Sequence, residues 1–445
     1  MGQEIPAEFY LFKSYVLNQD IGQNWDQITS IGGPRYSIIK TDNFDQDSLY
    51  IDLRGGVYKL KDATAIYGFS RFRYKKYFYG YLYPRVVNDP SKFSRYSGIP
   101  RDITRGSFNS GETDLSGIGF QNNWAYFQIG RGRESIGAGN DINLALSYNS
   151  PPYDYIMLGS DYGKLRVKYI HGFLESSENF INRYITARAF EFTNKKNIVI
   201  SFSEVIIYSG EKRPIDFSYL NPISTHLEVE LNDKLNFIGD SDANAIWQGS
   251  IDWLINKRIR FSGNLLFDEF VLDNSELNEG KEHGRAFSTR LSYSSLIYKE
   301  IYFTLFTYYV NVGTPTFRHG NGYNNLVQRS KALGYENGSD LEDISIGLNF
   351  FNKKNIIINF KYLKHIQGEE SILERPYEKY ANYIKDDFPS GNLFIQTNKE
   401  LNIQYWFRKN ASIIINYKLL NESGKNRVKS FNFGLDLFFP KKITI

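Results

Sequence analysis

The chain of 445 residues contains no cysteine and only two methionines. Without thiols it can form no disulfide and can hold no metal through thiolate ligands. Its mean hydropathy is −0.43, and no apolar run approaches the roughly 18 residues that a membrane-spanning helix needs. These absences exclude disulfide-stapled and helical membrane proteins. They leave open a β-barrel, because its strands cross lipid with alternating polar and apolar residues.

An excess of charge of one sign is also missing, because 53 Lys and Arg stand against 49 Asp and Glu. A nucleic-acid groove needs clustered basic residues, so we expect no nucleic-acid partner. Residues 1–5 lack the charged and apolar regions of a secretory signal peptide. Because the rest of the chain indicates the cell envelope, we expect a mature form from which that peptide has been removed.

Aromatic residues are abundant, with 34 Tyr, 34 Phe and 5 Trp. Tyrosine suits a boundary between apolar and wet surroundings. Apolar and polar residues alternate with a period of two along most of the C-terminal half. In residues 258–267, for example, Ile259, Phe261 and Leu265 alternate with charged or polar side chains. Many of these runs reach the length of about 10 residues that a tilted membrane strand requires, whereas soluble strands cluster near 5–6 residues.

The expected connections between strands alternate between short and long. Tight turns are expected at residues 194–197, 256–257, 298–299, 352–355 and 408–410. Long polar loops are expected at residues 209–225, 273–284, 313–341 and 367–399. A barrel in an outer membrane has short periplasmic turns and long extracellular loops, whereas a soluble sandwich has no reason to sort its loops by end.

These patterns predict an all-β fold, a transmembrane antiparallel up-and-down β-barrel of about 18 strands, within a range of 16–20. We expect residues 1–34 to form a periplasmic or plug-like segment and residues 35–445 to form the barrel, in the outer membrane of a Gram-negative bacterium. Strands are expected near residues 35–41, 48–60, 64–86, 117–130, 141–149, 154–160, 164–174, 182–193, 198–208, 226–232, 235–240, 245–255, 258–269, 285–296, 300–311, 342–351, 355–366, 399–408, 411–420 and 428–439.

Catalytic motifs are absent from the sequence. It contains no H-E-x-x-H, no G-x-S-x-G, no P-loop and no G-x-G-x-x-G, and its five histidines are far apart. We therefore expect no enzyme, no cofactor and no metal. Residues 240–244 have the oxygen spacing that opens an EF-hand loop but lack its later Gly and Glu. An Asx-rich turn and a calcium site both remain open there.

Charged residues occur inside the predicted strands. An Arg or Lys that faces lipid near the midplane costs about 2–4 kcal/mol, so most of these residues must face the lumen or lie beyond the hydrocarbon. They are either an internal salt-bridge ladder or a lumenal site for a polar ligand. The polar residues that we expect to be lumenal or structural are Arg183, Arg188, Glu204 and Arg213.

The predicted long loops carry tyrosine together with arginine. Aromatic faces stack on sugar rings, and Arg donors bind hydroxyls and acidic groups, which suits an acidic polysaccharide. The alternative is that barrel loops and interfacial girdles are rich in tyrosine without any ligand. The expected polysaccharide-binding residues are Arg318, His319, Tyr323, Tyr335, Arg375, Tyr377, Tyr380 and Tyr383.

An ordered set of short segments lies in the stretch from about residue 130 to residue 270: Gly-Arg-Gly-Arg at 130–133, Asn-Leu-Ala-Leu-Ser-Tyr-Asn-Ser-Pro-Pro-Tyr-Asp at 143–154, Tyr-Ile-His-Gly-Phe-Leu-Glu-Ser at 169–176, Arg-Tyr-Ile at 183–185, Phe-Ser-Glu at 202–204, Tyr-Ser-Gly at 208–210 and Tyr-Leu-Asn-Pro at 219–222. This set resembles the Wzi-like capsule assembly family of outer-membrane β-barrel proteins. The resemblance implies an eighteen-stranded barrel that acts as a lectin and not as an enzyme. His171, Glu204, Arg213 and Asn221 are polar residues within this stretch of the chain. The family's N-terminal helical bundle has no counterpart of sufficient length in residues 1–34.

Three functions follow as hypotheses. The first is a non-enzymatic barrel that binds and organises capsular or exopolysaccharide at the cell surface. The second is a porin or nutrient channel. The third is an accessory barrel subunit of a larger outer-membrane complex. The expected partners are outer-membrane lipid, surface polysaccharide and, for the third hypothesis, other outer-membrane or periplasmic proteins.

Overall fold

The structure is a computed structural model that describes residues 48–445 apart from 76, 94–95, 103–105, 123, 139–141, 178–179, 195–196, 237–242, 257, 270–273, 279–281, 299–300, 353–354, 380–386 and 409. The expected N-terminal segment at residues 1–34 and the expected strand at 35–41 lie outside the described residues.

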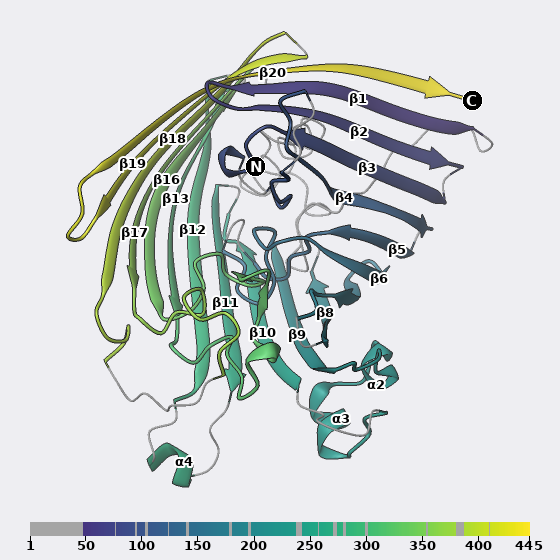
Figure 1. The fold of residues 1–445 in the computed structure, drawn as a ribbon, viewed down its shortest axis with the longest axis vertical. Helices are drawn as coiled ribbons and strands as arrows, with labels where there is room; N and C mark the ends of the chain where they lie inside the picture. The colour runs from purple at the N-terminus through teal and green to yellow at the C-terminus, as the bar shows by residue number, and fades with distance from the viewer. Residues whose placement is uncertain are drawn as a thin grey trace.

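One 18-stranded antiparallel sheet closes on itself into a barrel (Figure 1). Each strand pairs with its neighbours along the chain, and β1 pairs with β20 to close the ring. The strands of the barrel are β1 (Leu49–Leu60), β2 (Thr64–Tyr74), β3 (Phe78–Val87), β4 (Ser110–Gln121), β5 (Ala125–Gly132), β6 (Tyr153–Asp161), β7 (Leu165–Phe173), β8 (Ile181–Thr193), β9 (Ile198–Glu211), β10 (Ala243–Leu254), β11 (Ile259–Glu269), β12 (Gly284–Tyr298), β13 (Ile301–Val312), β16 (Leu341–Asn352), β17 (Ile356–Gln367), β18 (Phe394–Arg408), β19 (Ala411–Glu422) and β20 (Val428–Thr444).

A few short elements lie in the loops of the barrel. The hairpin of β14 and β15 belongs to the long connection between β13 and β16. None of the helices in the described part of the chain is long and apolar enough to cross a membrane. The short elements are η2 (Pro90–Lys92), α2 (Phe217–Leu220), α3 (His226–Leu231), α4 (Asn274–Asn278), η3 (Gly322–Asn324), β14 (Val327–Gln328) and β15 (Lys331–Ala332).

The predicted fold class and strand number are confirmed, although several individual strands were predicted wrongly. The runs at 64–86 and 117–130 each contain a turn between two strands. The first turn includes Lys75 at a φ of 52°. Glycine or asparagine usually occupies this left-handed conformation, so a lysine gave no sign of the turn. Residues 142–149 form a loop with one isolated bridge, Ile136 to Leu146. In the predicted strand at 226–232, residues 226–231 form α3, and Asn232 is its C-cap.

The connections sort by end as predicted. The turns after β6, β8, β10 and β18 are short, and they lie at the end of the barrel where β1 begins and β20 ends. The opposite end carries the connections of residues 88–109, 133–152, 212–242, 313–340 and 368–393. This arrangement makes the end with tight turns periplasmic and the other end extracellular.

The outer face of the wall carries a belt of exposed apolar side chains. Along the strands they alternate with buried or polar residues that point inward. A soluble protein has the opposite arrangement, with apolar side chains inside and polar ones outside. Lipid is the surrounding that such a belt requires. Its exposed members include Ile66, Phe72, Leu82, Ile118, Ile129, Leu158, Phe190, Phe202, Leu265, Leu291, Leu305, Ile346, Phe360, Phe407, Phe431 and Phe433.

Ion pairs bridge the inner face of several strands. Arg166 bonds Glu191 at 2.8 Å between β7 and β8, and Arg260 bonds Asp252 between β11 and β10. All four of these side chains are buried. We expected the charged residues of the predicted strands to form either an internal salt-bridge ladder or a lumenal site for a polar ligand. In this part of the wall they form internal salt bridges.

Candidate functional site

Extracellular loops fold back into the barrel and pack against one another there. The loop of residues 133–152 meets the loop of residues 313–340 through two backbone hydrogen bonds. The N–H of Tyr335 donates to the carbonyl of Leu144 at 3.1 Å, and the N–H of Ser147 donates to the carbonyl of Leu333 at 2.9 Å. A buried apolar cluster forms around these contacts, with Ile136, Leu144 and Leu146 from one loop and Phe317, Leu326, Val327 and Leu333 from the other.

Polar side chains on the inner face of the wall hold the loop of residues 133–152 through its backbone. The side-chain oxygen of Gln248 on β10 accepts from the N–H of Ala145 at 2.9 Å. On β11 the amide of Asn264 accepts from the N–H of Ala138 at 2.7 Å and donates to its carbonyl at 2.6 Å. Loop backbone that is buried inside a barrel, away from water, needs such partners for its N–H and C=O groups.

Arg183 of β8 ties the second loop to the wall. Its buried guanidinium donates to three carbonyls, those of Tyr323 at 2.6 Å and of Asn325 and Val327 at 3.0 Å each. It also donates to Glu175 at 2.8 Å. This residue, expected to be lumenal or structural, therefore lies in the lumen as an anchor for the loop.

Glu175 is the point where three loops meet. One of its oxygens accepts from Arg183, from the N–H of Arg329 at 2.8 Å and from the hydroxyl of Tyr377. These partners come from β8 and from the loops after β13 and β17. We name Glu175, Arg183 and Tyr377 the loop clamp. Sequence reasoning did not single out Glu175, because nothing local marks a carboxylate whose partners are distant in the chain.

Burial raises the pKa of the Tyr377 hydroxyl, and its hydrogen bond to Glu175 raises it further. The hydroxyl therefore stays protonated and remains the donor in this bond. The ring of Tyr377 also lies 5.3 Å from the guanidinium carbon of Arg183. A cation over an aromatic face is stabilised electrostatically, more so when both are shielded from water.

Two of the expected polysaccharide-binding residues are buried and hold the loops together. Arg318 donates to the carbonyls of Glu370, Ser371 and Arg375, at 2.9 to 3.2 Å. The hydroxyl of Tyr335 donates to Asp343 of β16 at 2.6 Å.

Four others lie nearer the surface of the same end. The rings of Tyr323 and Tyr377 are tilted against each other, with centroids 6.4 Å apart, and both are partly exposed. His319 is also partly exposed, and the side chain of Arg375 is 47% exposed. We name Tyr323, Tyr377, His319 and Arg375 the loop face. The remaining two candidates, Tyr380 and Tyr383, lie outside the described residues.

Arg188 and Glu204 lie on the outer side of the wall and not in the lumen. Arg188 shares a face of β8 with Phe190, which is 47% exposed to the lipid side, and Glu204 shares a face of β9 with the exposed Phe202. Both charged side chains are nevertheless buried. The connection of residues 212–236, with α2 and α3, covers them from outside (Figure 1). We name this segment the bracket.

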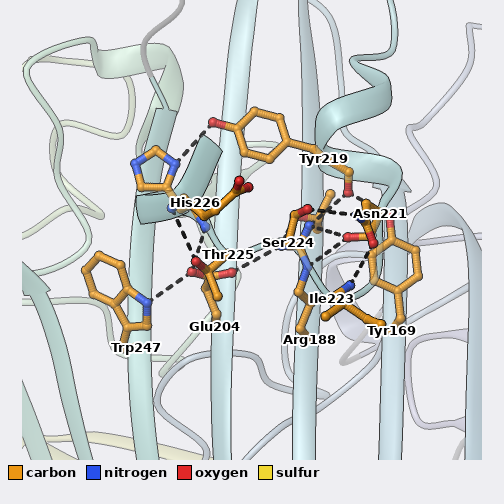
Figure 2. Close-up of polar contacts among 12 residues, drawn as sticks. Tyr169, Arg188, Glu204, Tyr219, Asn221, Ile223, Ser224, Thr225, His226 and Trp247 are labelled. Atoms are coloured by element: carbon orange, nitrogen blue, oxygen red, sulfur yellow. Dashed lines mark hydrogen bonds and ion pairs between the residues drawn. The ribbon is translucent and has the colours of Figure 1, made fainter. Parts of the chain in front are cut away.

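The bracket satisfies both charges (Figure 2). Arg188 donates to Glu204 at 3.2 Å and to the carbonyls of Tyr219 and Asn221 at 3.0 Å. The other oxygen of Glu204 accepts from the N–H of His226 at 3.0 Å and from the indole of Trp247 at 3.1 Å. The pair is thus shielded from lipid and needs no ligand.

Arg213, expected to be lumenal or structural, lies fully buried in the bracket. It donates to the carbonyl of Ser209 at 2.9 Å and lies 3.6 Å from Asp216. Of residues 240–244, where an Asx-rich turn and a calcium site were the alternatives, Asp240, Ser241 and Asp242 lie outside the described residues, and Ala243 and Asn244 begin β10.

The closed sheet, the apolar belt and the sorting of loops define the class: an outer-membrane β-barrel of the Gram-negative type. No protein-family model matches the chain, and no curated protein matches it. Among solved structures the chain is similar to Wzi of Escherichia coli, an outer-membrane protein involved in group 1 capsule assembly and a carbohydrate-binding β-barrel. The TM-score is 0.59 at 10% identity, over 88% of this chain and 84% of that one.

The chain is also similar to OprD of Pseudomonas aeruginosa, with a TM-score of 0.49 at 11% identity, over 91% of this chain and 97% of that one. OpdQ of the same organism gives a TM-score of 0.45 at 9% identity, over 89% and 100% of the two chains. At this identity the comparison with Wzi is one of fold.

Proposed function

We propose that this chain is a non-enzymatic outer-membrane barrel whose loop face binds surface polysaccharide. The observation that carries the proposal is the loop clamp, because it fixes the extracellular loops and presents Tyr323, Tyr377 and Arg375 on a rigid support. A rigid site loses less conformational entropy on binding than mobile loops do. The similarity of fold to Wzi supports the same reading.

The chemistry of the loop face suits an acidic glycan. Tyrosine rings offer apolar faces for sugar rings and hydroxyls for hydrogen bonds, and a guanidinium binds a carboxylate through two parallel bonds. The guanidinium of Arg375 forms two long ion pairs, with Glu370 at 3.5 Å and with Glu378 at 3.7 Å, and its side chain is 47% exposed. Such weak surface pairs are easily exchanged for a ligand.

The proposal is tested by equilibrium binding of an acidic capsular polysaccharide to the purified barrel in a detergent that contains no sugar. The double variant Tyr323→Ala, Arg375→Gln should bind at least tenfold more weakly. Tyr162→Ala is the matched control, since Tyr162 is 61% exposed in the periplasmic turn after β6, and it should bind like the wild type. Equal binding by the double variant and the wild type would overturn the proposal.

A selective channel is the second candidate function, and one observation favours it. On the inner face of β18 and β19, the side chains of Glu400 and Lys418 are 30% and 49% exposed, so this sector of the lumen is open to water. Large, steady single-channel currents in planar bilayers would support the channel. Their absence would favour the binding protein.

A further inference from the structure

We propose that the inner wall of β16–β20 carries a binding track for a neutral, hydroxyl-rich chain, such as an oligosaccharide, separate from the loop face. The track is a row of asparagines, one on each of five consecutive strands. They are direct partners in the strand register: Asn349 with Asn359, Asn359 with Asn402, Asn402 with Asn416, and Asn416 with Asn432. We name this row the asparagine row.

The row faces the lumen. Residues next to its members on the same strands belong to the lipid-facing belt: Leu348 is 40% exposed, Phe360 41% and Phe431 61%. Since successive side chains of a strand point to opposite faces, the asparagines point inward. Asn432 is exposed and Asn402 partly exposed, so the inner surface beside them holds water.

Four of the five amide groups of the row are available to a ligand. Within the described part of the chain, the side chains of Asn349, Asn359, Asn402 and Asn432 form no hydrogen bond with another protein group. They therefore do not serve as an interstrand ladder of bonded amides, which would be the structural explanation for such a row. Unpaired amides in water are free to exchange that water for ligand hydroxyls.

The chemistry of the row matches a sugar chain. Each asparagine offers one acceptor and two donors, and a sugar hydroxyl is both donor and acceptor. Neighbouring strands lie about 4.8 Å apart, so the row repeats this pattern at regular steps across the wall. The row itself carries no charge, which favours a neutral ligand over an acidic one.

The adjacent row contains charges of both signs. Lys361 is the register partner of Glu400, and Glu400 is the partner of Lys418 at 3.3 Å. The carboxylate between the two ammonium groups offsets one of their two positive charges, which leaves a net charge of +1. It also accepts from the amide of Asn398 at 2.6 Å. This row therefore gives no strong field that would select an acidic chain.

The test is fluorescence anisotropy with maltohexaose that carries a label at its reducing end, added to the wild-type barrel in an amine-oxide detergent. The double variant Asn359→Leu, Asn402→Leu should weaken binding by about tenfold, since it removes the hydrogen bonds of two neighbouring amides to sugar hydroxyls. Asn311→Leu is the matched control. It makes the same change on β13 on the outer face, which Asn311 shares with exposed Leu305, and should leave affinity unchanged.

The loop-face variant Tyr323→Ala, Arg375→Gln separates this inference from the proposed function. It should keep its affinity for maltohexaose even where it has lost the acidic polysaccharide. If the double asparagine variant does not fold, as judged by migration in unheated gels, Asn432→Leu replaces it at the exposed end of the row. Wild-type barrel that fails to bind maltohexaose, or asparagine variants that bind it as the wild type does, would overturn the asparagine row as a binding track.

Discussion

Arg188 and Glu204 face each other across β8 and β9 on the lipid side of the wall, with Nη1 and Oε2 3.2 Å apart. Each lies two positions along its strand from an exposed phenylalanine, Phe190 or Phe202. An ion pair in such a place is tolerated only because the bracket supplies carbonyls and an N–H group and excludes lipid. The extracellular connection after β9 is thus part of the barrel wall.

The first prediction concerns this pair. Arg188→Met leaves Glu204 buried without its cation, and the free energy of unfolding should fall by about 3–5 kcal/mol. Denaturant titration in detergent micelles measures it. The control is Arg131→Met, because Arg131 pairs with Asp154 where both side chains are exposed, and such a pair contributes about 0–1 kcal/mol. Equal losses in the two variants would show that the bracket does not shield the pair.

The second prediction concerns the pH dependence of the bracket. Burial lowers the pKa of His226, although Glu230 and Glu204 act in the opposite direction. A histidine whose folded pKa lies below its unfolded value stabilises the fold at a pH above that unfolded value, about 6.5. This stability is lost as the pH falls from there through the folded pKa. His226→Gln should therefore reduce the loss of unfolding free energy between pH 7 and pH 5. An unchanged loss would contradict the assignment.

The third prediction concerns the loop clamp. Glu175→Gln removes the negative charge to which Arg183 and Tyr377 both donate. The loss of a charged hydrogen-bond partner by a buried group should lower the free energy of unfolding by about 1–3 kcal/mol. Amide hydrogen exchange should accelerate at residues 323–331 and leave β8 unchanged. Glu374→Gln is the control, because Glu374 is exposed in the loop after β17. Uniform acceleration over the whole chain would indicate global destabilisation and not release of the loops.

The fourth prediction concerns the packing of the inner loops. A Cβ at Gly334 would lie 2.1 Å from the carbonyl oxygen of Leu144. Both are backbone positions, so this clash is relieved only if the loop of residues 313–340 moves away from the loop of residues 133–152. Gly334→Ala should increase ion conductance through the barrel in planar bilayers. Gly320→Ala tests the same change in the same loop where nothing lies within 4 Å, and it should conduct like the wild type. An unaltered current in Gly334→Ala would mean that these loops do not limit conduction.

The sequence was sufficient to predict the barrel, because strand alternation at residues such as Ile259, Phe261 and Leu265 reports directly on the two faces of the wall. It was insufficient at residues 226–231, where a helix follows its N-cap residue Thr225. The hydroxyl of Thr225 accepts from the N–H of Glu228, and Thr-x-x-Glu is a capping pattern that period-two reasoning overlooks.

The candidate site was less predictable than the fold. Alternation places Arg188 on the same face as Phe190, yet the cost of charge in lipid argued for the lumen, because the sequence does not show that a loop covers the outer wall. Likewise Tyr335 and Arg318 are of residue types that often bind ligands. Their side chains instead bond Asp343 and Ser371, which come near them only when the loops fold inward. Contacts of this range have no local signal.

The most direct test of polysaccharide binding by the loop face is the amount of surface-retained polysaccharide on the organism that encodes this chain. Cells that carry Tyr323→Ala, Arg375→Gln at a wild-type level in the outer membrane should retain less polysaccharide and release more into the medium, with the total unchanged. Retention that stays the same in these cells, and also in cells that lack the gene, would contradict the account.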